Sequence, residues 1–467
     1  MIFSAKSINH SGKRRQALYL AVVSVCLVLL LFFAFRGELP FGYQGQPPSG
    51  GAQSLYPAED AYSGGKAYSA DMPAPAGGPG IGKALRPKPV PEDWEFTIIS
   101  TGDIMMHSPQ TGAGRDKTGK SYDFAFMFEK ITPILREADL VIGNLETTLA
   151  GEANGGYTGY PLFNAPEVLA RNLKEAGFTL VSTANNHSLD RRYQGLCVTL
   201  DHLDEAGLSH TGTFRTAEER NGIFHTEVRG VDIGVIAATY GTNGLTLPGE
   251  YGFAVNYIDE AQLLNDVRKA RLEGARYVIV MLHWGVEYQT RPNQEQEALA
   301  ASLIAGGADL ILGNHPHVLQ RGEIVRTPDL YAGNQASDKE KKQFIMYSQG
   351  NFVSNQEGMD KNTSIILKLT LGVDGATGEP FLKEAGFIPI YTQKKNRQGA
   401  YHHIVWPLEL ALADLEAGGL SFNAGDRAAI PKAWAYALES QPGLEPVMLK
   451  DTPLWGTLCG QPASGGG

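Results

Sequence analysis

From residue 95 onward, short apolar runs alternate with longer amphipathic segments. Short apolar runs bounded by turn residues predict buried strands, and apolar positions at helical spacing predict helices. Strands are predicted at 95–100, 140–142, 180–183, 231–238, 277–282, 310–312, 344–347, 365–371 and 387–391. Helices are predicted at 124–136, 166–176, 193–206, 259–273, 295–305 and 427–438. This alternation predicts an α/β fold, with helices on both sides of a mostly parallel or mixed sheet.

Polar side chains gather directly after the predicted strands, and in open α/β sheets sites form outside the carboxyl ends of strands. The candidate residues, in chain order, are Asp103, His107, Asn144, Glu146, Asn185, Asn186, His187, Asp190, His283, His315 and His317.

Each of these residues also has an ordinary structural interpretation. A single histidine after a strand is more often a structural residue than a ligand, and Asp103 could be a turn residue or a helix cap. Asn144, Asn185 and Asn186 could form hydrogen-bonded turns. The coincidence of four histidines and several carboxyl or amide groups at strand ends favours a metal site instead.

The predicted ligands are carboxylate, imidazole and amide groups without a thiolate. This set suits one or two divalent ions of Mn, Mg, Fe or Zn rather than copper. A carboxylate between two ligand sets can bridge two ions, an arrangement used for attack on phosphate esters. A histidine outside the metal shell would protonate the leaving oxygen.

An apolar segment at 17–36 is long enough to cross a bilayer, and Lys6, Lys13, Arg14 and Arg15 precede it. The positive-inside rule then leaves residues 1–16 in the cytoplasm and the rest of the chain outside. We expect a single-pass cell-membrane anchor, with a cleaved signal peptide as the alternative. Residues 37–92 are rich in Gly, Pro and Ser, which predicts a disordered stalk.

The remaining composition limits the function. The chain has 467 residues and a net charge of -10, which argues against a nucleic-acid partner, since such proteins need a basic face. The charged stretch 338–342 is expected to be a solvated loop in an insertion after residue 320. The folded domain is expected at 93–410, and the extension at 411–467 receives no role.

Six strings of the sequence resemble the CapA family of poly-γ-glutamate capsule proteins, within the calcineurin-like metallophosphoesterase superfamily. They are GDIMMH, ADLVIGNLETTLAG, NAPEVLARNLKEAGFTLVSTANNHSLD, GLCVTLDHLDEAGLSHTGT, VIVMLHWGVEYQTRPNQEQEALAASLIAGGADLILGNHPHVLQ and FIMYSQGNFV. The resemblance implies a metallophosphoesterase-like sandwich of mixed sheets flanked by helices.

The resemblance also implies roles for the site residues. Asp103 would bind metal, Glu146 would be the bridging carboxylate, and His187 would be a general acid oriented by Asp190. One ion would take Asp103, Glu146 and His317; the other would take Glu146, Asn186, His283 and His315. The superfamily usually begins with Asp-x-His and bridges with Asp, whereas this chain has His107 four residues after Asp103 and a Glu as the bridge. A one-metal site or a weak hydrolase therefore stays open.

The resemblance implies a metal-dependent hydrolase-type protein in making, exporting or trimming an anionic polymer such as poly-γ-glutamate. Its expected partners are the cytoplasmic membrane, the polymer and other capsule-synthesis membrane proteins. Two alternatives remain: an extracellular phosphoesterase or nucleotidase, and a non-catalytic scaffold of an export complex that contains metal.

Overall fold

A computed structural model describes residues 92–328, 340–397 and 399–460, all within one compact unit, Arg86–Gly467. The predicted cytoplasmic segment 1–16, the anchor 17–36 and all but the last residue of the stalk 37–92 lie outside the described residues. Among the helices of the described ranges, none combines the length and apolar character needed to cross a bilayer.

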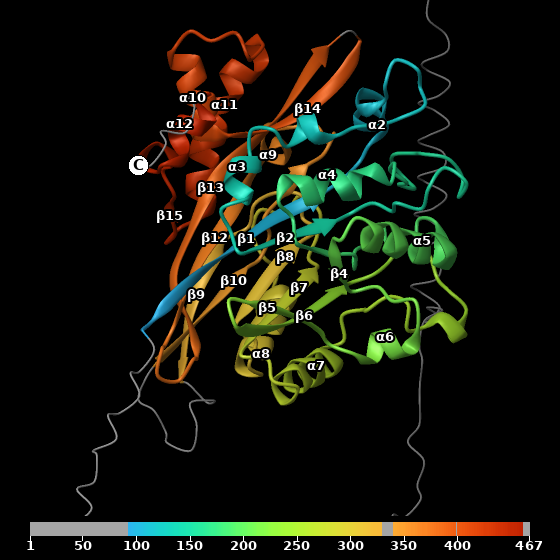
Figure 1. Ribbon diagram of the computed structural model, residues 1–467, viewed down its shortest axis with the longest axis vertical. Coiled ribbons are helices and arrows are strands. Elements are labelled where there is room, and N and C mark those ends of the chain that lie inside the picture. Colours follow the sequence, from blue (N-terminus) through green and yellow to red (C-terminus); the bar gives the residue numbers. More distant parts are fainter. Residues whose placement is uncertain (1–91, 329–339, 398, 461–467) are drawn as a thin grey trace, which may run out of the picture. The chain divides into compact units, whose positions relative to one another are not determined.

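The larger of two sheets is mixed (Figure 1). Its strand order is β14-β13-β12-β1-β2-β3-β4, where β1 to β4 run parallel and β12 to β14 are antiparallel to their neighbours. The bounds are β1 (Trp94–Ile104), β2 (Leu140–Leu145), β3 (Leu180–Ser182), β4 (Ser209–Thr211), β12 (Thr363–Val373), β13 (Pro380–Arg397) and β14 (Ala400–Pro407). Two short strands join this sheet, β11 (Asn351–Val353) beside β1 and β15 (Glu445–Pro446) beside β13.

The smaller sheet has the order β5-β6-β7-β8-β10-β9. Strands β6, β7, β8 and β10 run parallel, and β5 and β9 close the edges in antiparallel pairing. The bounds are β5 (Phe224–Val228), β6 (Val231–Thr239), β7 (Tyr277–His283), β8 (Leu310–Asn314), β9 (Gly322–Pro328) and β10 (Glu340–Met346).

The two sheets pack face to face and are covered by helices on their outer faces. Ile98 and Val235 belong to the core between the sheets, whereas Ile99 and Ile236, the next residues in each strand, pack under helices. Because both faces of these strands are buried, the strands read as unbroken apolar runs. The structure confirms a mixed α/β sandwich flanked by helices.

The helices differ in which sheet they cover. Helices α3 (Thr132–Leu135), α4 (Val168–Ala176) and α5 (Arg192–Glu205) lie on the larger sheet, and α7 (Glu260–Leu272) and α8 (Gln294–Ala305) on the smaller one. Helices α10 (Leu408–Glu416) and α11 (Ala424–Ser440) pack against β13 and β14 through a separate apolar cluster. The shorter helices are α2 (Ser108–Gly114), α6 (Ala217–Asn221), α9 (Met359–Asn362), α12 (Leu454–Leu458), η1 (Ala125–Met127), η2 (Gly249–Tyr251) and η3 (Leu449–Asp451).

Two local predictions are wrong. The helix expected at 124–136 is split into η1 and α3, because Pro133 fits the first turn of α3 but would interrupt a longer helix. The loop expected at 338–342 instead includes the start of β10 at Glu340. Lys341 there pairs with the fully buried Asp309, so a charge that looked solvated compensates a buried carboxylate.

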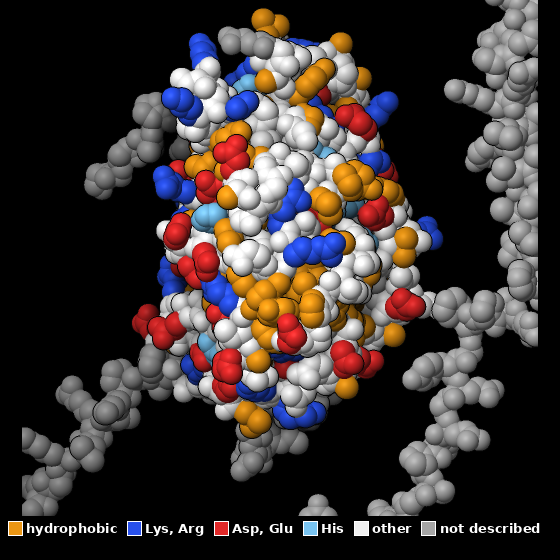
Figure 2. Space-filling view, turned by 90° about the vertical axis from the view of Figure 1, so that its right-hand side faces the viewer, with side chains coloured by type: hydrophobic (Ala, Val, Ile, Leu, Met, Phe, Trp, Pro, Cys, Tyr) orange, Lys and Arg blue, Asp and Glu red, His pale blue; other side chains and the backbone are white. Residues whose placement is uncertain are grey.

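The molecular surface carries both signs of charge. On the face shown in Figure 2, acidic and basic side chains are interspersed around a patch of hydrophobic ones. This face of the described residues therefore does not present the continuous basic track that a nucleic-acid backbone requires.

Candidate metal centre

The predicted site residues meet where parallel strands of both sheets end. Asp103 pairs with Asn144 across β1 and β2, and His283 pairs with Asn314 across β7 and β8. Glu146 directly follows β2, and the loops after β3 and β8 add the remaining side chains. Every predicted ligand or catalytic residue is at most 5% exposed: Asp103, Glu146, Asn186, His187, Asp190, His283, His315 and His317.

Asp103 is held by three hydrogen-bonding groups. Asn144 Nδ2 donates to its Oδ1 at 2.8 Å, and the backbone N–H of His315 donates to its Oδ2 at 3.3 Å. His317 Nδ1 lies 3.1 Å from the same Oδ2, so this nitrogen is the donor and Nε2 is left as the free nitrogen of His317. Asp103 therefore orients His317 as well as lining the site.

Glu146 lies among the imidazoles of the site. Its Oε1 is 3.7 Å from His283 Nε2 and 3.9 Å from His317 Nε2, and neither carboxylate oxygen has a hydrogen bond among the described residues. Burial, together with the negative charge of Asp103, raises the pKa of Glu146 well above its usual value. A buried, unpartnered carboxylate is costly unless a cation compensates it.

His283 sits between two asparagines. Asn144 Nδ2 is 3.1 Å from its Nδ1, and Asn186 Oδ1 is 3.0 Å from its Nε2. Burial and the neighbouring rings of His315 and His317 hold the pKa of His283 well below its usual value. The ring is therefore neutral at ordinary pH, which is the form that binds metal.

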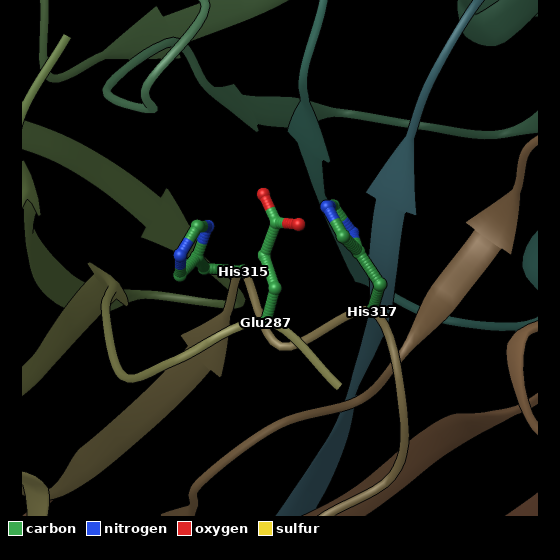
Figure 3. A group of neighbouring side chains, drawn as sticks. All are labelled: Glu287, His315 and His317. Carbon is green, nitrogen blue, oxygen red and sulfur yellow. The ribbon is translucent and has the colours of Figure 1, made fainter. Parts of the chain in front are cut away.

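His315 and His317 lie on a tight turn after β8, and both have positive φ, 99° and 60°. Burial, and after it His317, lowers the pKa of His315 to about 3, so this ring is also neutral. Glu287, from the loop after β7, directs its carboxylate between the two rings (Figure 3).

His187 and Asp190 form a buried pair beside the cluster. His187 Nδ1 lies 2.7 Å from Asp190 Oδ2, and the backbone N–H of Phe163 donates to the same oxygen at 2.6 Å. The Phe163 ring meets the His187 ring edge-on, with 4.6 Å between centroids. Asp190 thus fixes the orientation of His187, and Phe163 shields the pair.

These residues fit a divalent ion. Two groups each bring three ligand atoms within 4.8 Å of one another: Asp103, Glu146 and His283, and Glu287, His315 and His317. The resemblance implied a different assignment of ligands to the two ions, with His317 beside Asp103 at one ion and His315 beside His283 at the other. Neutral imidazoles and unpartnered carboxylate oxygens are the donor set of Mn, Fe or Zn sites.

The structure assigns surroundings to three further candidate residues, Asn144, Asn185 and His107. Asn144 joins Asp103 to His283 and is not merely a turn residue. Asn185 is structural, because its side chain donates to the carbonyl of Leu145 and accepts from the backbone of His187. His107 belongs to neither ligand group, and its Nδ1 accepts the backbone N–H of Asn355.

Sequence reasoning missed Glu287. The only signal was its place four residues after His283, and no spacing rule marks it as a ligand. Its proximity to His315 and His317 depends on how two loops meet, which is a tertiary property.

Two curated relatives of the chain have names from capsule or PGA biosynthesis. The chain is 30% identical over 300 residues to the capsule biosynthesis protein CapA of Bacillus anthracis, covering 63% of this chain and 68% of that protein. It is 29% identical over 307 residues to the PGA biosynthesis protein CapA of Bacillus subtilis (strain 168), covering 63% of this chain and 73% of that protein.

Among solved structures, the NAD nucleotidase NadN of Haemophilus influenzae matches with a TM-score of 0.40 and 13% identity, covering 75% of this chain and 64% of that chain. The bacterial capsule synthesis protein family PGA_cap matches residues 97–356, a range that contains every candidate ligand described above. The chain therefore belongs to the PGA_cap family of bacterial capsule synthesis proteins.

Proposed function

We propose that this protein acts outside the cytoplasmic membrane in the synthesis, export or processing of an anionic polymer such as poly-γ-glutamate. It does so through a hydrolase-type site that holds one or two divalent metal ions. Family membership, and the capsule and PGA biosynthesis names of the two CapA relatives, support the polymer. The observation that carries the hydrolase-type site is Glu146, whose two buried oxygens have no hydrogen-bond partner in the part of the chain that the structure describes and lie beside neutral imidazoles.

Membrane attachment is part of the proposal. The apolar segment 17–36 with its preceding lysines and arginines supports an anchor whose folded domain faces outward. An outward-facing domain would meet a polymer as the polymer leaves the cell.

The chain's own residues supply orientation and proton transfer. Divalent ions at this site would contribute Lewis acidity. Asp190 holds the Nδ1 side of His187, so that the other ring nitrogen can give a proton to the leaving group. The edge of Phe163 limits the access of water to this pair.

Exposed side chains beside the histidines suit an anionic chain. The Tyr240 and Tyr288 rings, 48% and 49% exposed, lie 4.5 Å from His315 and 6.1 Å from His317 between centroids. The Lys361 ammonium is 5.3 Å from the centre of the Tyr288 ring. Phenol hydroxyls and one cation offer hydrogen bonds and charge to carboxylates.

Cleavage of the polymer by the full-length chain tests the proposal. The purified protein is stripped with a chelator, reloaded with Mn²⁺ and incubated with poly-γ-glutamate, and new amino ends and chain length are measured. We expect metal-dependent shortening, which His187→Ala reduces by about 10²–10⁴-fold, as for loss of a general acid. His225→Ala, at the edge strand β5 where His225 pairs with Asp232, is the control and should leave the rate unchanged.

Two outcomes would replace the proposal. Hydrolysis of bis(p-nitrophenyl) phosphate without polymer cleavage favours the extracellular phosphoesterase, which the buried His187–Asp190 pair also suits. Bound metal without turnover of either substrate favours the scaffold.

A further inference from the structure

The loop that carries Glu287 is tied to the loop that carries the two neighbouring histidines. The backbone N–H of Tyr288 donates to the carbonyl of Pro316 at 2.8 Å, midway between His315 and His317. This bond places Glu287 beside both imidazoles, and its carboxylate points between them (Figure 3). Glu287, His315 and His317 each offer a ligand atom within 4.8 Å of the other two.

The histidines of this group have nitrogens available for a ligand. His315 is 3% exposed, and its buried Nδ1 has no hydrogen-bond partner among the described residues. His317 is 2% exposed and uses Nδ1 to bond Asp103, which leaves Nε2 free. An imidazole nitrogen buried without a partner is costly in a protein interior, and coordination of a cation removes that cost.

A solvated surface carboxylate is the ordinary interpretation of Glu287, because its side chain is exposed. That interpretation does not account for the buried nitrogen of His315 beside it. Asp103 and Glu146 form a group with His283, whereas the carboxylate that forms a group with both His315 and His317 is Glu287. Two imidazoles and one carboxylate form a common three-ligand set with open positions for water or substrate.

The first motif of the chain departs from the usual metallophosphoesterase motif. Metallophosphoesterases usually carry a histidine two residues after the first aspartate, where this chain has the buried Met105. His107 lies in neither ligand group. With Glu287, each of the two groups offers three protein ligands.

We propose that Glu287 is the third protein ligand of an outer divalent ion, which His315 and His317 also bind, next to an inner group of Asp103, Glu146 and His283. The inference rests on the proposed metal centre but not on any catalytic activity. Its ligand is a divalent cation of the Mn, Fe or Zn type.

Metal binding by the full-length protein tests this assignment without a turnover assay. Chelator-treated protein is titrated with Mn²⁺, the number and affinity of sites are measured by calorimetry, and the bound ion is followed by electron paramagnetic resonance. Glu287→Gln removes the charge at constant size, and Glu287→Asp keeps the charge but shortens the reach. Glu250→Gln, an exposed glutamate in η2, is the matched control.

We expect two sites in the wild type, with one site weakened at least tenfold by Glu287→Gln, less so by Glu287→Asp, and not by Glu250→Gln. A single wild-type site that Glu287→Gln weakens also supports the assignment. Equal stoichiometry, affinity and resonance spectrum in wild type and Glu287→Gln would overturn it. A wild type that binds no Mn²⁺ would overturn the metal centre as a whole, which separates the two failures.

Discussion

Glu146→Gln should have opposite effects on stability with and without metal. In the metal-free protein, the ligand oxygens of Glu146 and Asp103 lie within 4.8 Å of each other. Two unit charges at that distance repel by about 3.5 kcal/mol at an effective dielectric constant of about 20. The raised pKa of Glu146 means that a bound proton already relieves part of this repulsion. We therefore expect the metal-free variant to be more stable than the wild type by about 1–3 kcal/mol.

Metal should reverse this order. An ion that binds only the folded state stabilises the wild type by about 2.7 kcal/mol when its free concentration is about 100 times its Kd. Glu146→Gln removes the central carboxylate and should lose most of that gain. For a domain of this size, about 2 cal/mol/K of unfolding entropy per residue gives roughly 1–2 °C per kcal/mol.

Scanning calorimetry in a chelator and in Mn²⁺ measures both effects. The variant should melt a few degrees above the wild type in the chelator and below it in Mn²⁺, while Glu250→Gln follows the wild type throughout. The reasoning fails if the variant melts below the wild type in the chelator, or if both proteins gain equally from Mn²⁺.

Two further predictions concern the scaffold. Gly102→Ala would place its Cβ 1.9 Å from the carbonyl oxygen of Gly350, so we expect urea unfolding to show a loss of about 3 kcal/mol in the free energy of unfolding. Gly112→Ala is the control and should lose no stability, because nothing lies within 4 Å of its added Cβ. Equal urea midpoints for the two variants would contradict this prediction. Burial lowers the pKa of His403 from 6.5 to about 3. The unfolded chain therefore takes up a proton at a higher pH than the folded protein does. The stability that is present above about pH 6.5 is lost as the pH falls towards 3. His403→Gln should make unfolding free energy fall less steeply between about pH 6 and 4, by about 1.4 kcal/mol per pH unit, and unchanged slopes would count against this effect.

The sequence was most informative where a local pattern decides the structure. Helix α4 ends at Gly177, whose φ of 120° suits glycine, so its end could be predicted from the chain alone. The strand-end positions of Asp103, Glu146 and His283 were likewise visible, because parallel strands bring their carboxyl ends to one margin.

The sequence was least informative where two distant segments must meet. Glu287 lies close to His315 where a backbone hydrogen bond from Tyr288 to Pro316 joins two loops, and the apolar pattern of the sequence does not predict this contact. The division of the strands into two sheets could not be derived from the pattern either, because Ile98 and Ile99 are equally apolar yet face different layers. Lys341 looked solvated because its buried partner, Asp309, is distant in sequence.

The joining of the two sheets has a consequence for when an ion can be acquired. Asp103 and Glu146 come from the larger sheet and His283 from the smaller one, so neither half alone offers the complete inner group. A newly made chain therefore gains its affinity for the ion only after the halves have docked. Ion binding would then stabilise only chains in which the two sheets are already docked. A substitution that weakens the docking should release the ion before any helix unfolds.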